Sequence, residues 1–235
     1  MSARTTALCA LIATRRQGAW SDGILKEYVQ RDRLERRDAA LAAALTYGVM
    51  QNRMLLDHYL EQVVSGGLSR LQPAMLDILR LGAYQILLLD KIPDSAAVNE
   101  AVEQTKRYVN QKAAGMTNGA LRALSRKKGS LNEPRDLATK YSHPQALVEL
   151  LMQSVGENQI EPFLRADNEP APTCLQINPL LSNPDEVERA LTEQEILFRK
   201  HPWLPGCYLV TGTGNLARLE LFASGKVYVL SLIHI

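Results

Sequence analysis

The chain has 235 residues, enough for one large domain or two ordinary ones, and 46% of them are hydrophobic, enough to fill a core. Its net charge of +2 is unevenly spread: residues 1–128 hold 19 Lys and Arg against 12 Asp and Glu, and residues 129–235 hold 8 against 13. The first half therefore suits a polyanionic partner, and the second half does not.

The cysteines and histidines exclude several other kinds of protein. Cys9, Cys174 and Cys207 are far apart and include no Cys-x-x-Cys pair, which argues against a disulfide framework or a zinc site and fits a reducing cytoplasm. The four histidines are scattered and form no set of metal ligands. No apolar run approaches the ~20 residues of a membrane span, so we expect no membrane partner. The scattered histidines likewise lead us to expect no metal partner.

The first half of the chain has the apolar spacing of a helical bundle. The helix that Pro73 opens is apolar on almost every side, which predicts that other helices surround it. Pro93 ends that pattern, and Asp94 or Ser95 is expected to cap the next helix. Helices are predicted over residues 3–16, 21–30, 34–51, 55–63, 73–88, 94–109 and 115–128.

Residues 133–167 are predicted to form two or three short helices, followed by a linker at Pro170-Ala171-Pro172. After this linker the spacing of apolar residues changes. The pattern then predicts strands at 174–177, 196–198 and 207–211, a helix over about 183–193, and a hairpin of 219–222 and 226–229 around Ser224-Gly225. The fold class is therefore mainly α, an all-α helical bundle followed by a small, incomplete α/β segment. The last strand is expected to lack a partner.

Six motifs, in this order and spacing, resemble a known family. They are YGVMQNRMLLD at Tyr47–Asp57, ILRLGAYQILLLDK at Ile78–Lys91 with the following IPDSAAVNEAVEQTK, then MTNGALRAL, YSHP at Tyr141–Pro144 and LQINPL at Leu175–Leu180. The chain resembles bacterial ribosomal RNA cytosine-C5 methyltransferases of the Sun (RsmB) group. Its N-terminal part resembles the antitermination factor NusB.

The resemblance implies a division of the chain and a role. Residues 1–130 would be a NusB-like RNA-binding helical domain, residues 131–170 a helical linker region, and residues 171–229 the incomplete start of the methyltransferase module. The partner would be small-subunit ribosomal RNA. S-adenosylmethionine would be the cofactor of the full-length parent, with no cofactor in this chain.

The largest departure from the family is the ending. The family continues its final strand into Tyr-Val-Gln-Asp, whereas Tyr228-Val229 is followed here by Leu230 and five further residues. Residues 230–235 match one reading frame of a sequencing-transposon adapter, so we expect a non-native tail that is exposed or poorly ordered. The edge at Val227–Val229 would then be uncovered.

No residue is predicted to be catalytic. The family reaction needs a cysteine thiolate in a Pro-Cys motif and a second cysteine in Thr-Cys-Ser. Thr173-Cys174 lacks the serine and Cys207 follows Gly206, so both cysteines are expected to be buried, and Cys9 is expected to lie in the core. The Gly-x-Gly of Tyr208–Asn215 is interpreted as a turn between short strands, not a cofactor loop.

Arginines near the N-terminus are the candidate RNA-binding residues, because a guanidinium group can form paired hydrogen bonds with phosphate. These arginines form two groups. The first is expected to have no acid nearby. The second is interleaved with Asp32, Glu35 and Asp38, which can form local ion pairs with it, and the alternative to RNA binding is that this group is only a solvent-exposed face. The first group is Arg4, Arg15 and Arg16, and the second is Arg33, Arg36 and Arg37, beside Arg31.

The different-class alternative is a free-standing NusB-like module that binds RNA or protein in transcription antitermination. The strand-rich segment after Pro172 discriminates between the two, because such a module has no need of it. The expectation is therefore the RNA-binding front part of an enzyme, inactive by itself.

Overall fold

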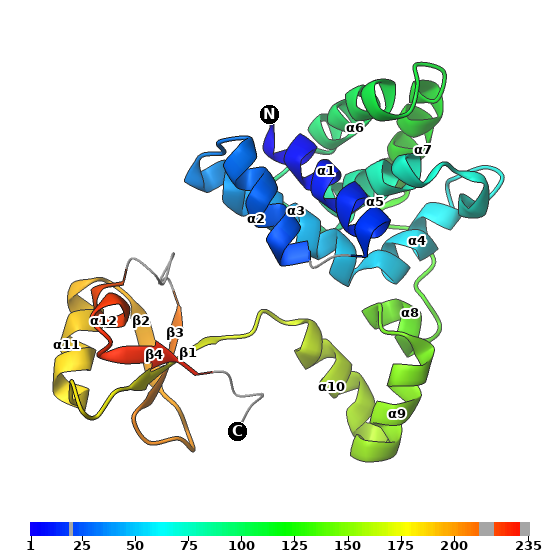
Figure 1. The fold of residues 1–235 in the computed structure, drawn as a ribbon. Coiled ribbons are helices and arrows are strands. Elements are labelled where there is room, and N and C mark those ends of the chain that lie inside the picture. The colour runs from blue at the N-terminus through cyan, green and yellow to red at the C-terminus, as the bar shows by residue number, and fades with distance from the viewer. Residues whose placement is uncertain (19–20, 212–218, 231–235) are drawn as a thin grey trace. The chain divides into compact units, whose positions relative to one another are not determined.

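The computed structural model describes residues 1–18, 21–211 and 219–230. The chain divides into two compact units, Met1–Asn168 and Glu169–Ile235 (Figure 1). The first unit is helical, and the second contains a small four-stranded sheet. The predicted fold class, mainly α with a small α/β segment, is confirmed. Among the described helices, none has both the length and the apolar character needed to cross a membrane.

The helices of the bundle follow the predicted pattern closely. Ser2 caps the first by accepting a hydrogen bond from the backbone N–H of Thr5, and Gly18 ends it in the left-handed conformation at φ 58°. The helices are α1 (Ala3–Gln17), α2 (Ser21–Arg31), α3 (Arg36–Gln51), α4 (Arg53–Glu61), α5 (Pro73–Leu88), α6 (Asp94–Tyr108) and α7 (Ala114–Lys127), with a 3-10 turn η1 (Leu68–Arg70).

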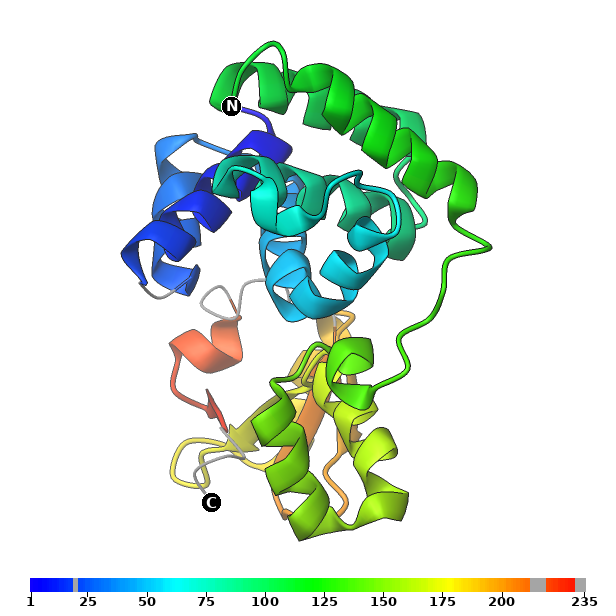
Figure 2. The same ribbon diagram turned by 90° about the vertical axis from the view of Figure 1, so that its right-hand side faces the viewer.

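Helix α5 is the centre of this bundle, as its sequence predicts. Its Ile78, Leu79 and Ile86 are fully buried, and it packs against α1, α3, α4, α6 and α7 (Figures 1 and 2). Gly82 lets α7 come close, because a Cβ at this position would collide with the side chain of Leu121. The apolar surface removed from water by this packing is the main stabilisation of the bundle.

The predicted cap of α6 is wrong. Its N-cap position is Pro93, and Asp94 lies in the first turn, where its carboxylate accepts a 2.6 Å hydrogen bond from Ser125 of α7. Asp94 therefore joins two helices instead of capping one. A carboxylate in the first turn still interacts favourably with the helix dipole.

Three short helices follow in the same unit: α8 (Leu137–Tyr141), α9 (Gln145–Val155) and α10 (Glu157–Asn168). Two residues of the YSHP motif connect these helices to one another and to α4 through hydrogen bonds. Ser142, left-handed at φ 55°, accepts a hydrogen bond from the backbone N–H of Leu55 in α4. The buried ring of His143 lies 2.7 Å from the carbonyl oxygen of Tyr141 and 2.9 Å from the carboxylate of Asp167 in α10.

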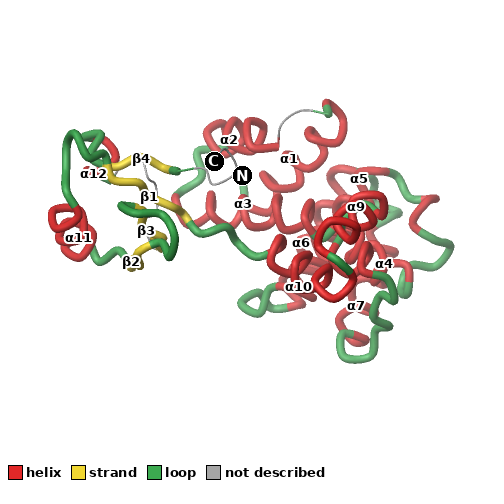
Figure 3. Tube along the Cα trace, turned by 90° about the horizontal axis from the view of Figure 1, so that it is seen from below, coloured by secondary structure: helices red, strands yellow, loops and turns green. Residues whose placement is uncertain are grey.

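The second unit is built on an antiparallel sheet of β1 (Thr173–Ile177), β2 (Leu197–Lys200), β3 (Cys207–Thr211) and β4 (Val227–Val229), in the order β2-β3-β1-β4. Leu175 pairs with Tyr208 on one side and with Val229 on the other. Helix α11 (Pro184–Glu193) packs Val187 and Leu191 against this sheet, and Figure 3 shows it beside the yellow strands.

The predicted hairpin of 219–222 and 226–229 is wrong. Glu220–Ala223 form a short helix, α12, and β4 pairs with β1. Buried Leu219 and Leu221 alternate with exposed residues and imitate a strand, but the carbonyl of Leu219 accepts from the backbone N–H of Ala223 as in a helical turn. The Gly-x-Gly turn predicted after β3 lies outside the described residues.

The last strand has a partner, contrary to expectation, because β4 pairs with β1, an inner strand of the sheet. Beyond β4, the backbone N–H of Leu230 donates a 2.9 Å hydrogen bond to the carbonyl oxygen of Cys174. The partly buried side chain of Leu230 packs beside Cys174 and Cys207. The exposed tail predicted to begin at residue 230 is therefore wrong for this residue, and residues 231–235 lie outside the described ranges. Among the described strands, β4 lies at an edge of the sheet, with Tyr228 and Val229 exposed.

Candidate functional site

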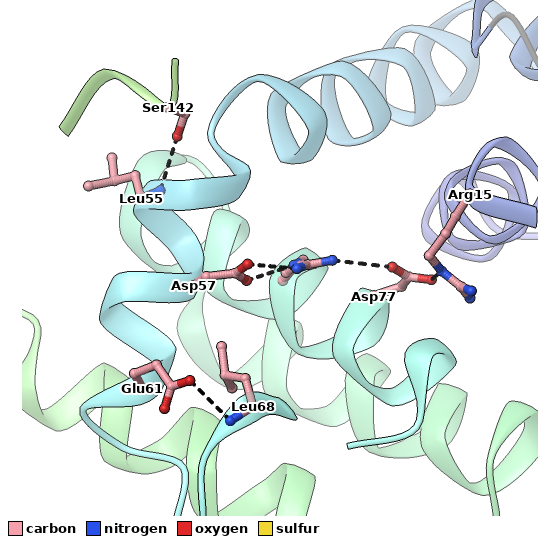
Figure 4. A network of polar contacts seen from close by, with 8 residues as sticks. Arg15, Leu55, Asp57, Glu61, Leu68, Asp77 and Ser142 are labelled. Atoms are coloured by element: carbon pink, nitrogen blue, oxygen red, sulfur yellow. Dashed lines mark hydrogen bonds and ion pairs between the residues drawn. The ribbon is translucent and has the colours of Figure 1, made fainter. Parts of the chain in front are cut away.

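An ionic network joins α1, α4 and α5 (Figure 4). Arg80 of α5 donates hydrogen bonds of 2.7 and 2.6 Å to the two carboxylate oxygens of Asp57 in α4. Another nitrogen of Arg80 lies 3.7 Å from Asp77. Asp77 accepts a 2.9 Å hydrogen bond from Nε of Arg15 in α1. The network thus ties the first helix of the bundle to its central helix.

Asp77 is a charged residue in an apolar helix, and only 7% of its side chain is exposed. Burial raises the pKa of Asp77, and the guanidinium groups of Arg15 and Arg80 oppose that rise. Arg15 was expected to have no nearby acid to neutralise it, and this is wrong in the folded chain, because Asp77, 62 residues away in the sequence, accepts its hydrogen bond. Neighbouring sequence carried no sign of this pair.

Arg4 and Arg16 lie at opposite ends of α1. Nε of Arg4 donates a 2.6 Å hydrogen bond to the side-chain oxygen of Gln85, which is buried in α5 and donates in turn to the carbonyl of Leu81. Arg4 therefore helps to fix α1 on α5. Arg16 is exposed, and among the described residues it forms no ion pair within 4 Å.

The second arginine group lies at the start of α3. Arg33 is in the left-handed conformation at φ 51°, and Arg36 and Arg37 form the first turn of the helix. Two cations there oppose the helix dipole, so they do not stabilise the helix end. All three are exposed and form no ion pair among the residues described.

Asp32 was expected to pair locally, and it does so with the neighbouring Arg31, although not with Arg33, Arg36 or Arg37. Its carboxylate accepts hydrogen bonds from Arg31, at 2.8 and 3.0 Å, and from the hydroxyl of Thr6, at 2.7 Å. These donors, Arg31 first, hold the pKa of Asp32 below its ordinary value. Arg33, Arg36 and Arg37 therefore face solvent without an ion pair among the described residues, beside the exposed carboxylates of Glu35 and Asp38.

A cavity of about 300 Å³ opens beside the ionic network. Helices α1, α3, α4 and α5 all contribute to its lining. Sequence reasoning missed Arg53 and Arg80 as members of this site, although an arginine in the apolar α5 is itself a sign of a specific partner. The lining residues are Leu11, Thr14, Arg15, Val49, Met50, Arg53, Asp77 and Arg80.

A second cavity of about 500 Å³ lies between the start of α6 and the end of α7. Arg122 and Arg126 are four residues apart on α7 and both line it, with Ser95 and Asn99 from α6. Arg126 and Lys127 also lie in the last turn of α7, where cations favour the helix end. The positions of Arg126 and Lys127 are therefore explained by stabilisation of the end of α7, without a ligand.

The cysteines do not form a nucleophilic site. Cys174 and Cys207 are buried together on one face of the sheet, and burial, followed by the neighbouring thiol, raises the pKa of Cys174 to about 11. A thiol in such surroundings is poorly ionised at neutral pH. Cys9 is only partly buried, against expectation, and lies 3.6 Å from the hydroxyl of Tyr108. Within the described ranges, no three His, Cys, Asp or Glu side chains gather in a way that could hold a metal ion.

The fold and these features define an all-α module with an arginine-rich surface, joined to a small antiparallel α/β unit. The model of the NusB family matches residues 1–126, more than half of the chain, so the chain belongs to the NusB family. A second model, the ferredoxin-like domain of RsmF/B-like methyltransferases, matches residues 143–216. This match includes α9, α10 and most of the sheet.

Named relatives agree with both matches. The Probable ribosomal RNA small subunit methyltransferase B of Bacillus subtilis (strain 168) is 30% identical over 233 residues, 97% of this chain and 52% of the relative. The Transcription antitermination protein NusB of Ruminiclostridium cellulolyticum is 34% identical over 131 residues, 55% of this chain and 89% of the relative. The chain thus spans about half the length of the methyltransferase relative.

Among solved structures, the crystal structure of PH0851 has a similar fold, with a TM-score of 0.63 at 19% identity. The similarity covers 96% of this chain and 52% of that chain. At this identity the likeness concerns the fold alone.

Proposed function

We propose that this chain is the RNA-binding portion of an S-adenosylmethionine-dependent ribosomal RNA cytosine-C5 methyltransferase. The observation that carries the proposal is the similarity to the Bacillus subtilis protein over 97% of the chain. In this proposal residues 1–130 bind RNA, residues 131–170 are a helical linker region, and residues 171–229 begin the methyltransferase module. The RNA would be that of the small ribosomal subunit.

The arginines of the first unit divide into two roles in this proposal. Arg16, Arg33, Arg36 and Arg37 are exposed and without ion pairs among the described residues, so they can bind phosphate groups. Arg4 and Arg15 use their Nε atoms within the fold, and only their remaining nitrogens can reach a phosphate. The first role supplies affinity, and the second supports the shape of the surface.

The described residues do not fit the catalytic part of the reaction. A cysteine that attacks the pyrimidine ring must be accessible and readily ionised, whereas Cys174 and Cys207 are buried in the sheet and burial raises the pKa of Cys174. No catalytic step is therefore assigned to them. The parent's thiolate and its S-adenosylmethionine site would lie outside the described residues.

The alternative is a free-standing NusB-like module that acts in transcription antitermination. The match to the Ruminiclostridium cellulolyticum protein over 89% of its length favours it for the first unit. The second unit, with its own sheet and core, favours the methyltransferase proposal, because residues 169–235 lie beyond the NusB-family match at 1–126.

The test is RNA binding by the full chain, measured by fluorescence anisotropy with a labelled small-subunit ribosomal RNA fragment at several salt concentrations. We expect weak binding that falls steeply with salt, because phosphate contacts release counterions. A parallel assay with labelled S-adenosylmethionine should show no methyl transfer above a control without protein. Absence of RNA binding at low salt would contradict the RNA-binding role. Methyl incorporation would contradict the expectation that this chain is inactive by itself.

A further inference from the structure

The imidazole of His143, in the YSHP motif, has a hydrogen-bond acceptor at each of its two ring nitrogens. Nδ1 lies 2.7 Å from the carbonyl oxygen of Tyr141, and Nε2 lies 2.9 Å from a carboxylate oxygen of Asp167. A neutral imidazole has one N–H group and one acceptor nitrogen, whereas an imidazolium has two N–H donors. Only the imidazolium can donate to both oxygens, so the surroundings of His143 favour the cation.

A proton on Asp167 does not account for this geometry. The side chain of Asp167 is 59% exposed, and a carboxyl group so open to water is ionised at neutral pH. With Asp167 ionised and His143 neutral, one ring nitrogen would turn its lone pair towards an oxygen lone pair. Because the ring is buried, such an unmade hydrogen bond would be unfavourable.

Two helices end at this histidine. Tyr141 is the last residue of α8, and Asp167 lies in the last turn of α10, next to Asn168 at its end. Carbonyl groups at a helix end and a carboxylate in the last turn both favour a nearby cation. Asn168 also donates a 2.9 Å hydrogen bond to the Tyr141 carbonyl, so this one oxygen joins the ends of both helices.

The other charged and titratable groups on the surrounding helices do not compete for His143. Asp167 is the one acidic side chain, among the described residues, with an oxygen within 4 Å of the ring. Glu157 and Arg165 of α10 are exposed. The rest have partners of their own: Lys140 and the Tyr141 hydroxyl with Glu161, Asp136 with the backbone of Thr139, Glu149 with Gln145, Asp57 with Arg80, and His58 with the carbonyl of Asn132.

We propose that His143 is a proton-dependent latch at the end of the first unit. As an imidazolium it donates to Tyr141 and Asp167 and holds the ends of α8 and α10 together. When the pH rises and the ring loses one proton, one of these hydrogen bonds is lost and the last turn of α10 is released. The first unit ends at Asn168, so the latch acts where the chain leaves this unit.

The direction of the pH dependence follows from the proton count. At neutral pH the folded chain with its latch closed binds one proton more than a chain in which this ring is free and neutral. The latch therefore contributes stability at mildly acidic pH, and this contribution is lost as the pH rises. The inference goes beyond RNA binding and is independent of it.

His201 provides an internal control, because its surroundings demand the opposite state. Its Nδ1 accepts hydrogen bonds of 3.3 and 3.2 Å from the backbone N–H groups of Trp203 and Leu204, so this nitrogen carries no proton. Nitrogen-15 spectra of the ring nitrogens in the full chain are recorded at about pH 7.5, where most free imidazole is neutral. His143 should show two protonated nitrogens and His201 at most one. A His143 ring with a single protonated nitrogen would overturn the proposal.

Two substitutions on α10 separate the latch from a general loss of charge. Asp167→Asn supplies an amide that can donate to Nε2, so His143 should become neutral while Nδ1 still donates to Tyr141. Glu161→Gln removes equal charge where Lys140 binds and should leave both ring protons of His143 in place. The two carboxylates are 59% and 41% exposed, so both variants should fold. A doubly protonated His143 in Asp167→Asn would exclude Asp167 from the latch.

Hydrogen exchange measures the release itself. Between about pH 6 and pH 8.5, exchange of the backbone amides of residues 165–168, corrected for its intrinsic pH dependence, should accelerate roughly tenfold, the loss expected for one charge-assisted hydrogen bond. Glu161→Gln should show the same acceleration, and Asp167→Asn should show less than about a twofold change. A corrected wild-type rate that does not change with pH would mean that α10 is held without the proton, and would overturn the latch.

Discussion

Arg80 forms a two-pronged ion pair with Asp57, with hydrogen bonds of 2.7 and 2.6 Å, and the same guanidinium group faces Asp77 at 3.7 Å. One side chain thus neutralises carboxylates from two helices. Only 13% of Arg80 is exposed, so water screens the pairs poorly.

Replacing Arg80 should therefore be costly for stability. Arg80→Met fills similar space but leaves a buried carboxylate, Asp77, and a half-buried one, Asp57, without this partner. We expect the free energy of unfolding to fall by about 3 kcal/mol. Arg80→Lys keeps the charge and loses the paired geometry, and should cost about 1 kcal/mol. Urea unfolding of both variants checks the order, and equal losses would show that the paired geometry contributes nothing.

Gly82 and Gly119 should respond to alanine in opposite directions. A Cβ at Gly82 would collide with Leu121, so Gly82→Ala should destabilise the bundle by about 1–3 kcal/mol. Gly119 lies on α7 with open space around its Cβ position, so Gly119→Ala should stabilise the chain by about 0.5–1 kcal/mol. Thermal unfolding decides, and a melting temperature raised by both substitutions would contradict the close α5–α7 packing.

Asp32 gives stability with a defined pH dependence. Arg31 and then Thr6 lower its pKa below 3.8, so its ionised form is favoured in the folded state. This contribution is complete above the ordinary pKa and is lost as the pH falls through the lowered value. Thr6→Val removes a 2.7 Å hydrogen bond to the carboxylate and should cost about 1 kcal/mol at pH 7.

The cost of Thr6→Val should shrink when the pH falls well below 4, because a protonated Asp32 is a weaker acceptor. Urea unfolding of the wild type and the variant across this range provides the measurement. A cost that stays constant down to the lowest pH would mean that the hydroxyl acts through packing alone.

Phosphate binding is predicted to involve arginines that have no structural partner. Substituting Arg16, Arg36 and Arg37 together by Ala should weaken RNA binding and reduce the slope of log affinity against log salt by up to about 0.9 for each phosphate group that is no longer neutralised. Circular dichroism should stay unchanged, because these side chains are exposed. The structure favours this triple variant over one containing Arg4 and Arg15, which hold α1 on α5.

The matched control removes equal charge elsewhere, with Arg70, Arg107 and Lys112 changed together to Ala. These residues are also exposed. We expect this control to leave most of the salt slope intact. An identical effect of both triple variants would mean that net charge, and not the arginine surface, determines binding.

The sequence by itself determined the helices, the central position of α5 and the burial of Cys174 and Cys207. Helical periodicity is a local property, and a helix apolar on every side can only be stable when others cover it. The strands β1 and β3 were equally clear, because short apolar runs bounded by Pro and Gly have few other folds available. The family resemblance came from local motifs, and the comparisons confirmed it.

Only the tertiary structure decided which charges are free. Arg15 and Asp77 are 62 residues apart, and no local pattern could pair them. It also decided that Leu219 and Leu221 belong to a helical turn, since a period of two over so few residues fits either element. The partner of β4 and the cavity beside Arg15 depend on segments distant in the chain, and burial against those segments, not local preference, fixed them.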